Sequence, residues 1–243
     1  MSTRYGLYFA PPAQSALWSF GCAVLGWDAE TGTDAPQLAP PSMDAAAFHA
    51  LTEDPRRYGF HATLKAPFRL AAGTSAEDLV AALHDFCADR AAFRLPALEV
   101  RAVGANAAGD AFIALVEPET AEGATSALAA LERDVVLAFE PFRAPLAEAE
   151  IARRRPESLS ERQRENLMRY GYPGVLDLFR FHLTLTGRAP AAQVATLEAE
   201  LAALYAEHVV SRVADPGLTI DQIAIFEQVD GGRFTVRQRV LFV

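Results

Sequence analysis

The sequence has 243 residues and a formal net charge of −9, with 31 Asp and Glu against 22 Lys and Arg. An extended nucleic acid is not an expected partner, because such binding relies on a clustered excess of Lys and Arg, whereas a small anionic ligand in a local basic pocket is compatible with this charge. No run of 18 apolar residues predicts a membrane span, no signal peptide is recognisable, and the two cysteines show no metal-type spacing, so we expect a cytoplasmic protein without a membrane partner.

The first part of the chain alternates between predicted strands and helices. In chain order we expect a strand over 4–11, a helix over 13–26, a short helix over 43–54, a strand over 60–70, a helix over 74–91, strands over 93–105 and 111–118, and a helix over 120–139. Pro12 ends the first strand and Pro55 the short helix, because proline lacks a backbone N–H donor. Ser75 and Asp78 form a capping-box pattern, and Thr120 is a candidate helix cap.

The rest of the chain begins with its most polar segment, residues 143–178, which predicts two short helices separated near Pro156. This segment lies outside the repeat described next, and we interpret it as a helical insert and a candidate lid. A strand over 179–187, a long amphipathic helix over 189–213, and strands over 218–229 and 233–243 follow it. The last two strands are joined by Asp-Gly-Gly, which is a hairpin signal.

The sequence Phe-His-x-Thr-Leu occurs twice, with its histidines at His61 and His182. Each copy is followed by a predicted helix and then by two predicted strands, and the spacing from the histidine to the first of these strands is nearly the same in both copies. The shared order indicates an internal duplication of a β-α-β-β unit. We therefore expect an α+β fold in a single bilobal domain over 1–243, with lobe-forming halves over approximately 56–140 and 179–243 and a central groove.

The repeated segment places two kinds of reactive group on one face of a strand. Side chains two residues apart share a face, so His61 lies beside Thr63 and His182 beside Thr184, while the residues between them are apolar. Histidine titrates near neutral pH, so one imidazole can accept a proton while the other donates one, and the hydroxyls can bond the non-bridging oxygens of a phosphodiester. These four residues are the predicted catalytic groups, with the acid and base roles of the two histidines left open.

Two simpler interpretations compete with a catalytic one. A single His-x-Thr on a strand is in most cases only a half-buried strand, and the catalytic interpretation depends on the second copy at the equivalent point of the repeat. Metal ligation by His61 and His182 is disfavoured, because no Asp, Glu or Cys recurs beside both copies. We therefore expect neither a metal ion nor another cofactor.

The paired motifs "HATL" at 61–64 and "HLTL" at 182–185 resemble those of the two-histidine (2H) phosphoesterase superfamily. The flanking sequences "YFAPP", "LGWDAETG", "DPRRYGFHATLKAPF" and "RFHLTLTG" are similar to its DUF1045 branch, which is associated with phosphonate-utilisation operons. The resemblance implies a bilobal α+β fold with both motifs in the central cleft. It also implies metal-independent cleavage of a phosphodiester, often a cyclic one, and in the context of phosphonate breakdown 5-phosphoribosyl 1,2-cyclic phosphate is the expected substrate.

Several other residues are candidates for substrate binding. Lys65 shares the face of His61 on an ideal strand, with a solvated Lys at the strand end as the alternative. Tyr58 lies at the entrance of the first motif strand, where its hydroxyl could reach the groove. Tyr170 and Tyr172 lie just before the second motif and could stack on a sugar or base. The three arginines at 153–155 favour a solvated helix face, and phosphate contact from a closing lid is the alternative.

The expected function is thus hydrolysis of a small, preferably cyclic phosphodiester in phosphonate metabolism, with a small phosphorylated metabolite as the partner molecule. One alternative is an RNA-end cyclic phosphodiesterase or ligase of the same superfamily, which the acidic charge disfavours. A second alternative is a non-catalytic module that binds a phosphorylated metabolite. The sequence assigns no oligomeric state.

Overall fold

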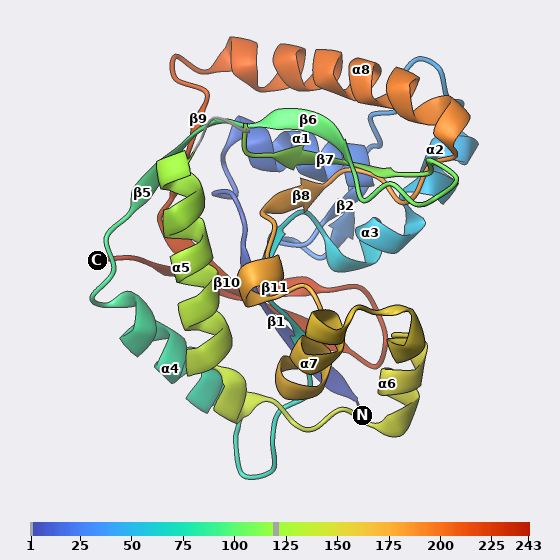
Figure 1. Cartoon of the computed structure of the whole chain (residues 1–243). Helices are drawn as coiled ribbons and strands as arrows, with labels where there is room; N and C mark the ends of the chain where they lie inside the picture. The colour runs from blue at the N-terminus through green and yellow to red at the C-terminus, as the bar shows by residue number, and fades with distance from the viewer. Residues whose placement is uncertain (1, 119–121) are drawn as a thin grey trace.

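Strands form the centre of the protein and helices cover their outer faces (Figure 1). The computed structural model describes residues 2–118 and 122–243. Its α-helices are α1 (Ala16–Leu25), α2 (Ala45–Leu51), α3 (Glu53–Tyr58), α4 (Ala76–Cys87), α5 (Glu122–Ala138), α6 (Glu148–Arg153), α7 (Glu161–Tyr170) and α8 (Ala191–His208). Short 3-10 turns occupy Glu140–Phe142, Pro156–Ser158, Leu176–Leu178 and Val210–Arg212. None of the described helices is long and apolar enough to cross a membrane.

Two antiparallel sheets carry the two histidine motifs, which confirms the α+β class predicted from the sequence. The first sheet has the strand order β11-β10-β1-β4, with bounds Thr235–Leu241, Gln222–Val229, Thr3–Phe9 and Ala62–Phe68. The second has the order β6-β7-β8, with bounds Glu99–Val103, Phe112–Val116 and His182–Thr184. Two further pairs are β5 (Phe93–Ala97) with β9 (Gly217–Ile220), and β2 (Trp27–Asp28) with β3 (Thr33–Asp34).

The two repeated units exchange their hairpins. Strand β4 of the first unit lies in the sheet that contains β10 and β11 of the second unit, and β8 of the second unit pairs with β7 of the first. The exchange takes place where β5 pairs with β9. After Leu98 the chain continues from β5 into β6 of the second sheet, and after Asp221 it continues from β9 into β10 of the first sheet. The sequence halves over 56–140 and 179–243, which we expected to form the lobes, are therefore interleaved: each sheet takes its histidine strand from one half and its hairpin from the other.

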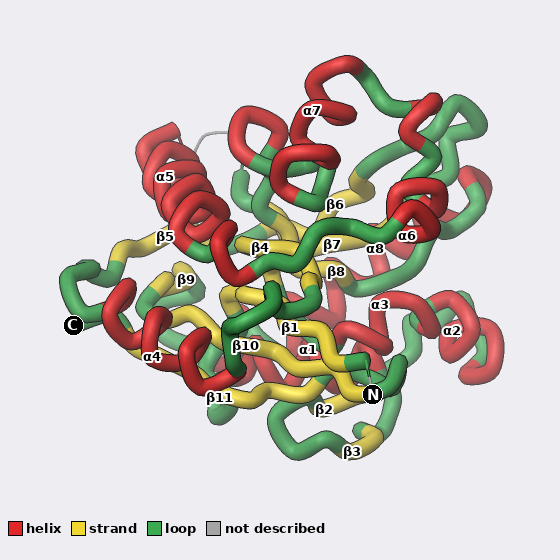
Figure 2. Tube along the Cα trace, turned by 90° about the horizontal axis from the view of Figure 1, so that it is seen from below, coloured by secondary structure: helices red, strands yellow, loops and turns green. Residues whose placement is uncertain are grey.

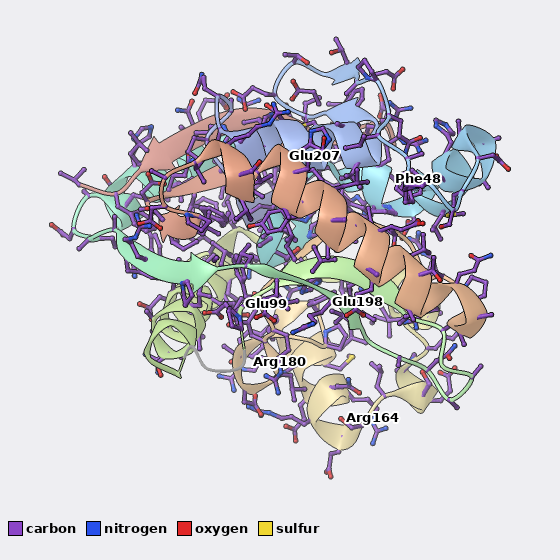
Figure 3. The ribbon with its side chains drawn as sticks, turned by 90° about the horizontal axis from the view of Figure 1, so that it is seen from above. Phe48, Glu99, Arg164, Arg180, Glu198 and Glu207 are labelled. Atoms are coloured by element: carbon purple, nitrogen blue, oxygen red, sulfur yellow. The ribbon has the colours of Figure 1, made fainter. Side chains whose placement is uncertain are left out.

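The helices repeat this exchange. Helix α4 packs on β10 and β11, and its counterpart α8 packs on β6 and β7, so each covers the hairpin of the other unit (Figure 2). Figure 3 shows α8 lying across the second sheet, with Glu198 close to the strand that carries Glu99. Glu198 accepts a hydrogen bond from the backbone N–H of Ala102 in β6 at 3.0 Å. This bond satisfies a donor on an edge strand, where backbone groups would otherwise lack a partner.

The short helix predicted over 43–54 differs from the structure at its C-terminal end. It is divided at Thr52 into α2 and α3, and Pro55 does not end a helix but lies inside α3. Proline is tolerated there because it occupies the first turn, where backbone N–H groups have no partner within the helix. Thr120, the predicted cap of the helix that became α5, lies outside the described residues.

Both histidine strands alternate as the sequence predicts. The apolar residues around each His and Thr are buried, while the His and Thr side chains are half-buried. The buried set is Phe60, Ala62 and Leu64 in the first copy and Phe181, Leu183 and Leu185 in the second. The apolar face of each strand thus holds it against the core, and the opposite face is left for a ligand.

The first histidine strand depends on a close contact with α1. Gly21 of this helix lies directly over Phe60, and a Cβ atom at Gly21 would come within 2.1 Å of the Phe60 ring. Ring and helix backbone touch only because residue 21 has no side chain. The contact fixes the position of Phe60 in the core and therefore helps to position His61, the next residue.

We predict that Gly21→Ala lowers the free energy of unfolding by about 1–3 kcal/mol, because the added methyl group overpacks a site that cannot expand. Urea unfolding measures this change. Ser19→Ala, an exposed substitution in the same helix, should stay within about 0.5 kcal/mol of the wild type. Phe60→Leu in the Gly21→Ala background should recover part of the lost stability, because the smaller side chain makes room for the methyl group. If Gly21→Ala is as stable as Ser19→Ala, the close contact between Gly21 and Phe60 is contradicted.

Candidate functional site

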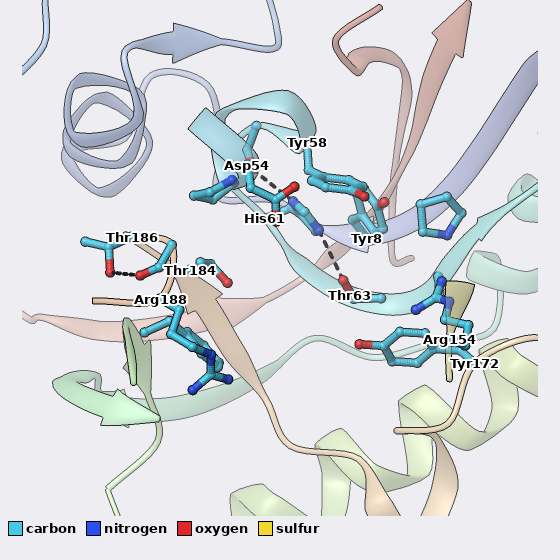
Figure 4. A pocket seen from close by; sticks show the side chains of 16 residues that line it. Tyr8, Asp54, Tyr58, His61, Thr63, Arg154, Tyr172, Thr184, Thr186 and Arg188 are labelled. Carbon is cyan, nitrogen blue, oxygen red and sulfur yellow. Dashed lines mark hydrogen bonds between the residues drawn. The ribbon is translucent and has the colours of Figure 1, made fainter. Parts of the chain in front are cut away.

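A cavity of about 380 Å³ lies where the two histidine strands come side by side. His61 and Thr63 line one wall and Thr184 another (Figure 4). His182 lies two residues before Thr184, on the same face of β8, and its ring centroid is 5.6 Å from that of Phe112, which also lines the cavity. The structure thus brings three of the four predicted catalytic residues, His61, Thr63 and Thr184, to the cavity wall. His182 itself does not line the cavity but packs against Phe112, which does.

The two imidazoles are held in the same way. The Nδ1 atom of His61 lies 2.9 Å from the carbonyl oxygen of Gly59, and Nδ1 of His182 lies 2.8 Å from the carbonyl oxygen of Arg180. A carbonyl can only accept, so each Nδ1 carries a hydrogen and donates it to the residue two positions earlier. In the neutral ring, Nε2 is then left as the proton-accepting nitrogen, which is the atom that acid–base chemistry requires.

The first histidine also bonds its motif partner. Nε2 of His61 and Oγ1 of Thr63 are 3.1 Å apart. With Nδ1 protonated, the neutral ring accepts this bond from the threonine hydroxyl. Thr63 therefore lies within reach of any oxygen that His61 protonates or deprotonates.

Burial favours the uncharged form of both histidines in the ligand-free protein. Burial lowers the pKa of His61 to about 4, with a smaller lowering from the charge of His182, while the bond to Gly59 acts in the opposite direction. Burial also lowers the pKa of His182, against the bond to Arg180. A positive charge on His182 disfavours protonation of His61, because like charges repel.

Tyr8 of β1 is a site residue that the motif alone does not reveal. Its ring stacks on His61 with centroids 3.7 Å apart and planes 20° apart, and the side chain is buried. Burial raises the pKa of the Tyr8 hydroxyl well above its usual value, so it stays neutral and offers no charge to an imidazolium. The Tyr8 ring covers one face of the His61 imidazole and shields that face from water.

Lys65 does not face the cavity, contrary to the expectation from strand alternation. Thr63 lies opposite Tyr8 in β1 and Lys65 opposite Leu7, so β4 contains one extra residue, Leu64, at a β-bulge. The bulge reverses the alternation beyond it. Lys65 is 2% exposed and donates to Glu140 at 2.8 Å, so it closes the packing against α5 and the following turn instead of contacting a substrate.

Two of the three candidate tyrosines line the cavity and one does not. Tyr58 stacks on Phe234 and Tyr172 reaches the cavity from the insert. Tyr170 lies outside the cavity, with the Arg169 guanidinium 5.2 Å from its ring centroid. The two insert tyrosines diverge because Gly171 between them has a φ of +78°, a left-handed conformation that ends α7.

Charged groups that the motif did not indicate also line the cavity. Arg154 and Arg188 contribute guanidinium groups and Asp54 contributes a carboxylate. Arg188 follows directly after the second motif, and its Nη1 donates to the carbonyl oxygens of Gly104 and Asp110. Within the described ranges, no three His, Cys, Asp or Glu side chains are grouped as metal ligands would be.

Comparison with known proteins adds two curated relatives. The chain is 36% identical over 241 residues to "Ribose 1,5-bisphosphate phosphokinase PhnN" of Janthinobacterium sp. (strain Marseille), covering 99% of this chain and 51% of that protein. It is 33% identical over 233 residues to the protein of the same name from Laribacter hongkongensis (strain HLHK9), covering 94% of this chain and 49% of that protein. The chain therefore spans about half the length of the curated relatives it matches.

Solved structures resemble the chain more weakly. TT0787 of Thermus thermophilus has a TM-score of 0.45 at 14% identity, covering 98% of this chain and 97% of that one. E. coli LigT complexed with 3'-AMP has a TM-score of 0.43 at 13% identity, covering 100% and 99%. Similarity at this level does not by itself identify a function.

One protein family matches the sequence directly. The family described as "Protein of unknown function (DUF1045)" matches residues 63–235, which include Thr63, the insert and the whole second motif. This match covers most of the chain, and it agrees with the branch that the sequences flanking the motifs resemble. The chain belongs to the DUF1045 family.

Proposed function

We propose that this protein is a metal-independent phosphodiesterase of the two-histidine type, in which one of His61 and His182 is the proton donor and the other is the proton acceptor. The observation that carries this proposal is the matched placement of the two rings: each donates through Nδ1 to the carbonyl two residues earlier, and each lies on the same strand face as a threonine. A protein that only bound phosphate would need donors, but it would not need two imidazoles prepared in the same tautomer.

The reaction begins when a phosphodiester enters the cavity between the two His-Thr pairs. Its negative charge raises the pKa of the imidazoles, so one ring takes up a proton while the other stays neutral. The neutral ring removes a proton from water as the water oxygen attacks phosphorus. The protonated ring gives its proton to the oxygen that leaves, so the P–O bond breaks without forming a free alkoxide. The hydroxyls of Thr63 and Thr184 donate to the non-bridging oxygens.

The favoured substrate is a small cyclic phosphodiester, 5-phosphoribosyl 1,2-cyclic phosphate. Water attack that breaks the bond between phosphorus and O2 leaves the phosphate on O1 and yields ribose 1,5-bisphosphate. The curated relatives carry that compound in their name, and this chain matches only about half of their length. The kinase step is not assigned to this chain, because its single lysine, Lys65, is buried, and no Gly-Lys-Ser or Gly-Lys-Thr segment of a phosphate-binding loop occurs.

We predict that His61→Ala and His182→Ala each lower kcat on a cyclic phosphodiester by about 10²–10⁴-fold, because each removes one proton-transfer group. The double variant should lose little more than the worse single variant, since the two groups act as a unit. Assays with EDTA should give full wild-type activity. His84→Ala, an exposed substitution on α4, is the matched control, and full activity in either motif variant would refute the proposal.

The product identifies the bond that breaks. Phosphorus NMR of the reaction with 5-phosphoribosyl 1,2-cyclic phosphate should show ribose 1,5-bisphosphate as the product. The isomer with its phosphate on O2 would contradict this direction of opening. Hydrolysis of oligonucleotide ends in preference to the sugar substrate would favour the RNA-end alternative.

The free protein should contain a histidine with an unusually low pKa. NMR titration of imidazole nitrogens should place the pKa of His61 at about 4, and inorganic phosphate should raise it because an anion favours the imidazolium. The signal is assigned by its loss in His61→Ala. A ligand-free pKa of about 6.5, the ordinary value for histidine, would show that Tyr8 and the surrounding core do not desolvate the ring.

A further inference from the structure

Arg154 points a positive charge at the cavity that the described part of the chain does not neutralise. Its guanidinium lies 5.1 Å from the centre of the Tyr172 ring and lines the cavity. Among the described residues, no carboxylate forms an ion pair with it and no hydrogen bond fixes its side chain. The acidic neighbour Glu150 is engaged by Arg69 at 2.8 Å. The guanidinium edge of Arg154 is therefore available to a ligand.

The support beneath Arg154 is rigid. The turn that carries Tyr172 is tied to α7 by Asn166, a buried residue whose Nδ2 donates to the carbonyl oxygen of Val175 at 3.1 Å. It is tied to α5 by Glu132, which accepts from the backbone N–H of Leu176 at 3.1 Å. Tyr172 thus presents a fixed ring face, and a guanidinium lying over an aromatic face keeps its N–H donors directed outward in its own plane.

Arg154 lies to one side of the reacting groups. In Figure 4, Arg154 and Tyr172 lie together on the side of the cavity near Thr63, while Thr184 and Arg188 lie on the other side. The scissile phosphate occupies the space between the His-Thr pairs. A guanidinium at one end of the cavity is then placed for a second negative group on the same substrate.

The cavity wall carries a net positive charge, although the protein as a whole is acidic. Two guanidinium groups and one carboxylate, Asp54, line it, in a protein whose formal net charge is −9. Burial lowers the pKa of both histidines and so favours their uncharged forms before substrate binds. The positive potential of the free cavity therefore comes from its arginines.

We propose that Arg154, stacked on Tyr172, binds a phosphomonoester carried by the substrate in addition to its scissile phosphodiester. This inference rests on the proposed function and extends it to substrate choice. The planar guanidinium matches two oxygens of a phosphate dianion, and such charge-assisted pairs are stronger than neutral hydrogen bonds. Both residues come from the insert over 143–178, so the insert selects the substrate while the repeated units carry out the chemistry.

The test compares ribose 1,2-cyclic phosphate with and without a phosphate on O5. The wild type should prefer the phosphorylated compound in kcat/KM, and Arg154→Gln should reduce this preference ratio about 10- to 100-fold, the size expected for a lost hydrogen bond to a charged group. Arg153→Gln is the matched control, because Nε of Arg153 bonds the carbonyl oxygen of Ala149 in its own helix and the side chain does not line the cavity. It should keep the wild-type ratio.

A binding measurement separates this inference from the proposed function. Calorimetry gives the dissociation constants of ribose 1,5-bisphosphate and ribose 1-phosphate, and their ratio measures the preference for the phosphate on O5 without turnover. If the wild type hydrolyses neither cyclic compound, the proposed function fails, and the calorimetric ratio alone decides the inference. A ratio in Arg154→Gln equal to that of the wild type overturns the subsite in either assay. Tyr172→Leu should lower the ratio less than Arg154→Gln, because it removes the support and not the charge.

Discussion

The antiparallel pairing of β5 with β9 is the constraint on which the site depends. These two short strands lie between the sheets, and each continues into the sheet that holds the other unit's histidine. The histidine strands are therefore positioned by backbone hydrogen bonds throughout and not by flexible connections. Strand β8 has only three residues, yet Ala114 and Val116 of β7 hold both of its functional side chains in register. A pair of imidazoles at one cavity requires this precision, because proton transfer works only over hydrogen-bond distances.

Different residues of the candidate site supply the proton-transfer groups and the positive charge that attracts an anion. Burial lowers the pKa of both histidines and so favours their uncharged forms, and His61 packs against Tyr8 while His182 packs against Phe112. The standing positive charge is supplied by Arg154 and Arg188, which lie at the rim and cost little to keep solvated. A buried imidazole that charges only in the presence of its substrate gives a proton donor that is active in the complex, and the free protein avoids the cost of two buried positive charges.

Strand periodicity was sufficient to predict which side chains share a face. It placed His61 beside Thr63 and His182 beside Thr184, and the burial of the intervening residues agrees with it. The same rule failed at Lys65, because a bulge is a property of pairing with β1 and leaves no mark in the sequence of β4 alone.

The unpredicted residues depend on contacts that local pattern does not encode. The sequence favoured a solvated helix face for all three arginines at 153–155, and what distinguishes Arg154 is its position at the C-terminal end of α6, where its guanidinium lies over the Tyr172 ring. The sequence showed a repeat but not the exchange of hairpins, since both arrangements bury the same apolar faces. The choice between them is made by the pairing of β5 with β9, two segments more than a hundred residues apart.

The interleaved sheets have a consequence for how the chain acquires its active form during synthesis. Strand β1 precedes the other described strands in the chain, but it pairs with β10, more than two hundred residues later, with Thr3 opposite Val229. Strand β4 can pair with β1 early, whereas the sheet that positions His61 is completed only when the last hairpin has left the ribosome. Contacts of such long sequence separation carry a large loop-closure entropy and form slowly. The cavity is therefore assembled last, and a nascent chain that stops short of the last hairpin lacks β10 and β11 of that sheet even though it already contains both histidine motifs.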